Sequence, residues 1–95
     1  MHKIKTKLGV IFFKEGKKFV AYSPALDLST YGNTFAQAKK RFAEAVDVFL
    51  GETIKMGTLE DVLKDCGWQK VSYPQKHWVP PTIVGQTEQE VKIPA

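Results

Sequence analysis

The fold is decided by residues 19–50, which read FVAYSPALDLSTYGNTFAQAKKRFAEAVDVFL. The first part predicts a strand over residues 19–22, which Pro24 interrupts because proline cannot donate to a β-ladder. Residues 26–31 then predict another short strand, and Gly32-Asn33 is a turn signal. Two strands and a turn therefore lead directly into the segment that begins at Thr34.

That segment predicts an amphipathic helix that ends at Gly57. Thr34 is the expected N-cap, and Gln37 stands three residues later, at the spacing of a capping box. Apolar and small side chains recur at helical spacing and form one stripe, which should pack across one face of the sheet. The stripe consists of Phe35, Ala38, Phe42, Ala45, Val46, Phe49 and Thr53.

The flanking segments predict further short elements. Residues 3–22 should form a hairpin, because apolar residues mostly alternate with lysines up to residue 12 and residues 14–17 form a polar turn around Gly16. Thr58 should cap a short helix over residues 59–65, with Gly67 as its C-terminal stop. Residues 68–73 predict a fourth strand, residues 74–81 a loop, and residues 89–93 a fifth strand.

Together these elements predict one α+β domain over residues 1–95. We expect an antiparallel sheet of three to five strands, in the order β-β-β-α-α-β, with one main amphipathic helix packed on one face. Apolar residues make up 43% of the chain and charged residues 25%, which is typical of a globular protein. No apolar run approaches the roughly 18 residues that a transmembrane helix needs, so we expect no membrane association.

The net charge of +4 is concentrated near the N-terminus. One interpretation is a phosphate-binding surface, and the other is protection of a strand edge against association with other sheets. Successive strand residues point to opposite faces, so we expect weak, non-specific binding to nucleic acid at most. The candidate nucleic-acid-binding residues are Lys3, Lys5, Lys7, Lys14, Lys17 and Lys18.

The sequence contains no recognisable catalytic, metal-binding or cofactor-binding pattern. His2 and His77 have no partner at a defined spacing, and Cys66 is the single cysteine. The first three expected strands contain one carboxylate, Asp27, which is too few for a two-metal nuclease site. We therefore expect no enzyme activity, no cofactor and no metal. The lack of any disulfide pair also fits a cytoplasmic location.

Residues 19–50 resemble the signature of HicB-type antitoxins in the order and spacing of five short motifs. The motifs are Ala21-Tyr22, Ser23-Pro24, Leu26-Asp27-Leu28, Gly32-Asn33-Thr34 and Glu44-Ala45. The resemblance implies a partial ribonuclease H-like fold without nuclease activity. It also implies a partner, a small ribonuclease toxin that cleaves mRNA and is neutralised by steric masking.

The expected function is therefore that of an antitoxin-like protein-binding module. Open sheet edges also predict self-association, most simply as a two-fold dimer. Residues 68–95 lack helical periodicity, so we expect no C-terminal DNA-binding module of the kind that many family members carry. Two alternatives stay open: a nucleic-acid-binding module that uses the basic hairpin, and an orphan domain without a toxin. The candidate partner-binding residues are Tyr22, Ser23, Pro24, Asp27, Tyr31, Asn33, Glu44 and Asp47.

Overall fold

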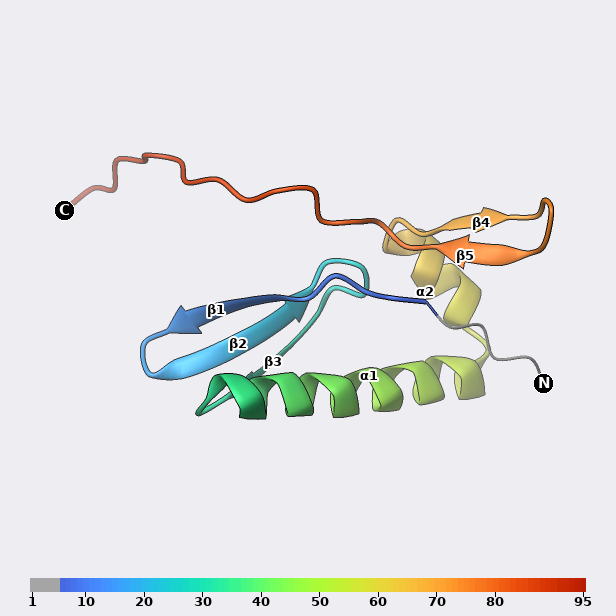
Figure 1. Cartoon of the computed structure of the whole chain (residues 1–95), viewed down its shortest axis with the longest axis horizontal. Coiled ribbons are helices and arrows are strands. Elements are labelled where there is room, and N and C mark those ends of the chain that lie inside the picture. Colours follow the sequence, from blue (N-terminus) through green and yellow to red (C-terminus); the bar gives the residue numbers. More distant parts are fainter. Residues whose placement is uncertain (1–5) are drawn as a thin grey trace.

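The computed structural model describes residues 6–95, which form a three-stranded antiparallel sheet, two helices and a separate two-stranded hairpin. Figure 1 shows the long helix α1 along one side of the sheet, with the short helix α2 and the hairpin β4–β5 at one end. The predicted α+β class, with one main helix on the sheet, is confirmed. The elements are β1 (Ile11–Glu15), β2 (Lys18–Ser23), β3 (Leu28–Gly32), α1 (Phe35–Met56), α2 (Leu59–Asp65), β4 (Gln69–Val71) and β5 (His77–Val79).

The main sheet is a meander in which β2 lies between β1 and β3. The β1–β2 ladder extends to Glu15 opposite Lys18, so the loop between these strands is only Gly16 and Lys17. Gly16 has a φ of 58°, the left-handed conformation that a two-residue hairpin loop demands. The turn is thus shorter than the predicted residues 14–17, because Lys14 and Glu15 remain paired with β2.

The first strand begins later than the alternation of apolar residues predicted. Residues 6–10 form no ladder, yet Leu8 and Val10 pack against the core. The alternation in this segment therefore reflects burial of alternate side chains and not strand pairing. The expected start of the hairpin, at residues 3–5, lies outside the described residues.

The turn between β2 and β3 occupies part of the predicted third strand, so β3 starts at Leu28 and not at residue 26. Ala25 and Leu26 are buried, but they lie in the turn. Asp27 has a φ of 49°, a left-handed conformation that aspartate tolerates better than most residues. The indole Nε1–H of Trp68 donates to the Ala25 carbonyl oxygen at 2.6 Å and fixes the turn from the C-terminal side.

Helix α1 begins and ends where the sequence predicts. The Thr34 hydroxyl oxygen accepts from the backbone N–H of Gln37 at 3.0 Å, which is the N-cap bond. The Gln37 side chain accepts from the backbone N–H of Asn33 at 2.6 Å, one residue before the expected capping-box position. Gly57 ends the helix with a φ of 70°. No helix within residues 6–95 is long and apolar enough to cross a membrane.

The predicted stripe of α1 packs on the sheet, and the core divides into two clusters. Phe42, at 5% exposure, lies in the first cluster between α1 and β2. Leu26, Leu63 and Trp68 form the second cluster, where the β2–β3 turn meets α2. Phe35, in the first turn of the helix, is 51% exposed, yet its ring centre lies 4.5 Å from that of Phe12 on the α1 side of the sheet, so it also packs on the sheet.

The region after α1 departs most from the predicted elements. Helix α2 has its predicted bounds, although Thr58 makes no side-chain cap hydrogen bond. Strand β4 falls within predicted residues 68–73, but its partner β5 lies inside the predicted loop 74–81, and the two form their own sheet. Residues 80–95 contain no helix or strand, so the fifth strand predicted at 89–93 is not formed within the chain. Three-residue strands show too little alternation to be recognised from sequence.

Candidate protein-binding face

The face of the sheet turned away from α1 exposes apolar side chains. The β1–β2–β3 register and the alternation along each strand decide which residues lie there. Ile11 is 37% exposed, Phe13 44% and Tyr31 57%, and within the described residues no helix lies over this side (Figure 1). A contiguous apolar group on one face marks an interaction surface. We call this surface the open face, and its apolar and aromatic members are Ile11, Phe13, Val20, Tyr22 and Tyr31.

Two expected partner-binding residues, Tyr31 and Asn33, lie together at one end of the open face. Lys18 joins them, because its Nζ donates to Asn33 Oδ1 at 2.6 Å and lies 5.8 Å from the centre of the Tyr31 ring. The Tyr31 carbonyl oxygen accepts from the Arg41 guanidinium at 3.1 Å, which ties the strand to α1. The exposed tyrosine therefore projects from a fixed backbone.

Tyr22 and Asp27 form a second pair at the opposite end of β2. The Tyr22 hydroxyl donates to Asp27 Oδ1 at 3.0 Å. This hydrogen bond is the main reason why the pKa of Tyr22 is raised above its ordinary value, with smaller effects from burial and from the Asp27 charge. Asp27 and Pro24 are both exposed on the turn, so the pair places a carboxylate at the rim of the open face.

Ser23 does not fit the expectation of an exposed contact residue. Its side chain is 0% exposed on the α1 side of the sheet, and its Oγ has no hydrogen-bond partner among residues 6–95. Pairing of Ser23 with Leu28 at the end of the β2–β3 ladder turns its side chain inward. Its neighbour in the motif, Pro24, is the exposed one.

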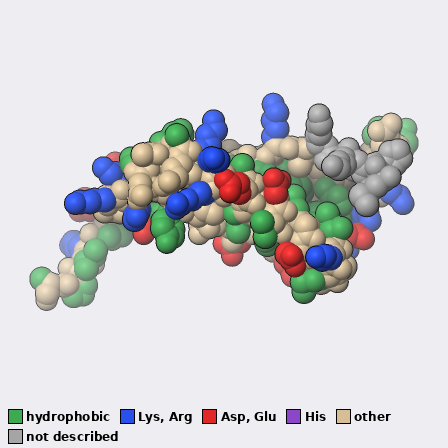
Figure 2. Space-filling model, turned by 90° about the horizontal axis from the view of Figure 1, so that it is seen from below, with side chains coloured by type: hydrophobic (Ala, Val, Ile, Leu, Met, Phe, Trp, Pro, Cys, Tyr) green, Lys and Arg blue, Asp and Glu red, His purple; other side chains and the backbone are tan. Residues whose placement is uncertain are grey.

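Glu44 and Asp47 lie on the outer surface of α1 and are exposed. This surface faces away from the sheet, so both carboxylates lie on the opposite side of the molecule from Tyr22 and Tyr31. Figure 2 looks onto the α1 side and shows acidic side chains among basic ones. The structure therefore divides the expected partner-binding residues between two sides of the protein.

Within residues 6–95, the lysines of the basic hairpin do not form one surface. Lys14 lies on the α1 side of the sheet, with its Nζ 5.5 Å from the centre of the Phe19 ring, whereas Lys18 lies on the open face. Lys17 is in the two-residue loop, and Lys7 precedes β1. Lys3 and Lys5 lie outside the described residues. The lysines that are described thus point in different directions.

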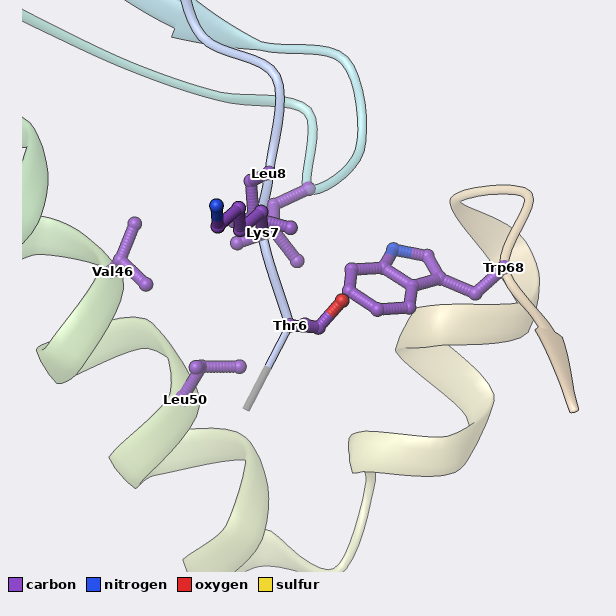
Figure 3. A pocket seen from close by; sticks show the side chains of 7 residues that line it. Thr6, Lys7, Leu8, Val46, Leu50 and Trp68 are labelled. Atoms are coloured by element: carbon purple, nitrogen blue, oxygen red, sulfur yellow. The ribbon is translucent and has the colours of Figure 1, made fainter. Parts of the chain in front are cut away.

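A hollow of about 500 Å³ lies between α1, the segment of residues 6–8, the β2–β3 turn and Trp68. Figure 3 shows Trp68 on one side of it and Val46 and Leu50 of α1 on the other, with Lys7 close to the α1 side. The walls are mainly apolar, and the Trp68 indole N–H is already donated to Ala25. The hollow lacks, among its described lining residues, the converging polar groups that orient a substrate.

Cys66 lies near enough to Asp27 and Asp65 for their charges to act on its thiol, and the His77 ring contacts a backbone carbonyl. Burial raises the pKa of the Cys66 thiol, and the charges of Asp27 and Asp65 raise it further, so the thiol stays protonated near neutral pH. His77 Nδ1 lies 2.8 Å from the Gln75 carbonyl oxygen. Within residues 6–95, no group of three His, Cys, Asp or Glu side chains is placed to hold a metal ion.

Sequence reasoning missed the apolar character of the open face. Ile11, Phe12 and Phe13 are consecutive, so one strand presents large apolar side chains to both faces. In the sequence, Ile11 occupies a position where the alternation of this segment otherwise has lysines, at Lys5 and Lys7. A run of consecutive apolar residues in a strand was the signal that both faces of the sheet carry apolar side chains.

Comparison of the chain with protein-family models, with curated proteins and with solved structures found no match. One fold class supports many functions, so a function has to be argued from a particular site. Here that site is the open face together with the turn and loop residues at its two ends.

Proposed function

We propose that this protein is an antitoxin-like protein-binding module, as its resemblance to HicB-type antitoxins implies. The partner is a small mRNA-cleaving ribonuclease, which the protein neutralises by covering the surface that contacts RNA. The observation that carries this proposal is the pair of tyrosines, Tyr22 and Tyr31, on the β2–β3 half of the open face. Tyrosine is enriched among the residues that dominate binding energy at interfaces.

The anchoring of these tyrosines supports a binding role. Tyr22 is held by Asp27, and the strand that carries Tyr31 is held by Arg41. A surface that is already ordered loses less conformational entropy when a partner docks. The proposed site therefore combines exposed aromatic area with a rigid support.

The polar groups around the tyrosines form a rim. Asp27 supplies a carboxylate at one end, while Asn33 and Lys18 supply an amide and an ammonium group at the other. Apolar centres with polar rims are the usual anatomy of protein interfaces. In this proposal Asp27 is the group that faces a basic toxin, because Glu44 and Asp47 lie on the other side of the molecule.

The positions of the motifs also support the proposal. The five motifs that carry the resemblance fall on β2, the β2–β3 turn, β3, the N-terminus of α1 and the middle of α1, without interruption. They therefore belong to one compact ββα unit. That this unit is a partial ribonuclease H-like fold stays a prediction.

The proposal is tested with the protein encoded beside this chain's gene, provided that it is a short basic chain with a Gly–His signature. Its expression alone should arrest growth of a host cell and cleave mRNA, and co-expression of this chain should restore growth. Tyr31→Ala should weaken binding of the purified pair by roughly 30-fold, the effect expected of an interface anchor worth about 2 kcal/mol.

Lys40→Ala is the matched control, because Lys40 is exposed on α1, away from the open face. It should leave the affinity within about a factor of two. The proposal would be contradicted if the protein encoded by the neighbouring gene caused no growth arrest. It would also be contradicted if the Tyr31→Ala variant bound that protein as tightly as the Lys40→Ala control does.

A further inference from the structure

The last fourteen residues form an extended arm that leaves the body of the protein. We call residues 82–95 the C-terminal arm. Three of its apolar side chains are strongly exposed: Val84 at 96%, Val91 at 67% and Ile93 at 81%. Figure 1 shows the C-terminal end projecting beyond the folded part. The radius of gyration is accordingly 16.0 Å, against about 12 Å for a compact chain of this length.

The arm departs from the body beside the beginning of β1. A Cβ atom added to Gly9 would lie 2.8 Å from Cδ1 of Ile83, so the arm crosses the chain two residues before β1. From there the arm runs in the same general direction as β1 and continues past the β1–β2 loop (Figure 1).

The length of the arm carries its apolar end beyond its own sheet. Six residues separate Gly9 from Glu15 at the end of β1, which is about 20 Å of strand at 3.3 Å per residue. Eight residues separate Ile83 from Val91, about 26 Å of extended chain. Val91 and Ile93 therefore lie past the tip of the sheet that their own chain forms, and their exposure within the chain agrees with this.

The edge of β1 is the complementary surface. Among residues 6–95 nothing pairs with the side of β1 that faces away from β2. Ile11 and Phe13 on this strand are the exposed apolar members of the open face nearest that edge. An unpaired edge beside exposed apolar side chains is the surface to which an extended segment adds as a strand.

The alternation of residues 89–93 matches that of β1. Val91 and Ile93 would lie on one face of an added strand, and Glu90 and Lys92 on the other. One register places Val91 beside Ile11 and Phe13, so that apolar side chains contact one another on the open face. The same register places Glu90 on the other face, where its carboxylate is on the same side as the Lys14 ammonium group. The same residues 89–93 showed strand character in the sequence but have no partner strand within their own chain.

We propose that residues 89–93 of the C-terminal arm pair with the β1 edge of a second copy of this chain, with Val91 and Ile93 covering Ile11 and Phe13 of that copy. The exchange is reciprocal, so a two-fold dimer satisfies both arms and both edges. The interface uses the β1 half of the open face and leaves the Tyr22 and Tyr31 half uncovered. It is independent of the proposed toxin binding.

The first test measures self-association of the full chain by sedimentation equilibrium at micromolar concentration. Val91→Asp should raise the dissociation constant of the dimer by about tenfold or more, because it would place a carboxylate against apolar side chains. Val84→Asp is the matched control, since it makes the same change in the same arm outside residues 89–93. A parent chain that is monomeric, or a dimer that resists Val91→Asp, would overturn the proposal.

The second test locates the contact by disulfide formation between two chains, both carrying Cys66→Ser. One chain carries Phe13→Cys, and the other carries either Val91→Cys or the control Lys92→Cys, which faces the other side of the added strand. After mixing and mild oxidation, the Val91→Cys chain should form several times more of the mixed disulfide with Phe13→Cys. Equal yields from the two arm positions would show that the arm does not pair with β1 in the proposed register.

Discussion

Residues 19–50 and residues 66–95 are segments of similar length that differ in what fixes their conformation. In the first segment, nearby residues set where the strands and the helix begin and end. Asp27 takes a left-handed conformation just before β3, Thr34 caps α1, and Gly32 lies close to the backbone of α1. In the second segment Trp68 is the single buried residue, and from residue 82 the chain extends away from the body. Local signals therefore fix the ββα unit, whereas the C-terminal region depends on distant partners.

This difference should also appear in stability. The core cluster around Phe42 joins β1, β2 and α1, so the ββα unit should open only on global unfolding. The β4–β5 hairpin packs against the second core cluster through Trp78, and Trp68 of that cluster directly precedes β4. We expect it to open at a lower free energy than the sheet and α1.

The largest expected effect comes from the centre of the ββα unit. Phe42→Ala should lower the free energy of unfolding by about 3–5 kcal/mol, because it removes a buried ring and leaves a cavity between α1 and the sheet. Urea denaturation followed by circular dichroism measures this change. Lys40→Ala is the control and should change stability by roughly 0.5 kcal/mol or less. Equal midpoints for the two variants would show that Phe42 is not in the core.

The next effect tests the link between the two segments. Trp68→Phe removes the indole N–H that the buried Ala25 carbonyl accepts, and an unsatisfied buried carbonyl should cost about 1–3 kcal/mol. Trp78→Phe is the matched control on β5, where the described residues show no indole hydrogen bond. It should cost less than about 1 kcal/mol. A smaller loss from Trp68→Phe than from Trp78→Phe would mean that the turn does not need this bond.

The ββα unit could be predicted from the sequence because its signals are short-range. Thr34, Gln37 and Gly57 marked the ends of α1, and the spacing of Ala38, Phe42 and the other stripe residues marked its buried face. The conformation of Asp27 was not predictable, since a left-handed aspartate has no distinctive pattern. It moved the start of β3 by two residues.

The C-terminal region and much of the candidate site could not be predicted, because they depend on pairing between distant residues. Strand β5 is three residues long and gains its partner only when β4 folds back on it. Likewise, the inward direction of Ser23 and the exposure of Phe13 follow from the ladder register and from the side on which α1 packs. A sequence gives the alternation of side chains but not which face a helix will cover.

A pair of glycines tests whether the junction between β3 and α1 is set by space. A Cβ on Gly32 would lie 2.7 Å from the backbone nitrogen of Ala38, so Gly32→Ala should destabilise the fold by about 1–3 kcal/mol. Gly51 lies within α1, with nothing inside 4 Å of an added Cβ. Gly51→Ala should therefore stabilise by about 0.5–1 kcal/mol, because alanine is the better helix former. Changes of the same sign in both variants would contradict a specific close approach at Gly32.

The smallest effect concerns the β2–β3 turn, which lies within the first segment and borders the open face. Because the Tyr22 hydroxyl donates to the Asp27 carboxylate, the pKa of Tyr22 is raised in the folded protein. The protonated phenol is thus favoured by folding. This contribution to stability is fully present below the unfolded pKa of tyrosine and is lost as the pH rises through the folded pKa.

Asp27→Asn separates the charge from the backbone geometry of the turn, because asparagine also accepts the left-handed conformation at this position. The neutral amide attracts the phenol proton less strongly than the carboxylate does. The pKa of Tyr22 should therefore fall towards its ordinary value. Titration of the assigned Tyr22 ring signals by NMR, in the parent chain and in the Asp27→Asn variant, measures this change. An unchanged Tyr22 titration would show that the Asp27 carboxylate does not hold this hydroxyl, and the turn would then lack the anchor that the proposed binding face requires.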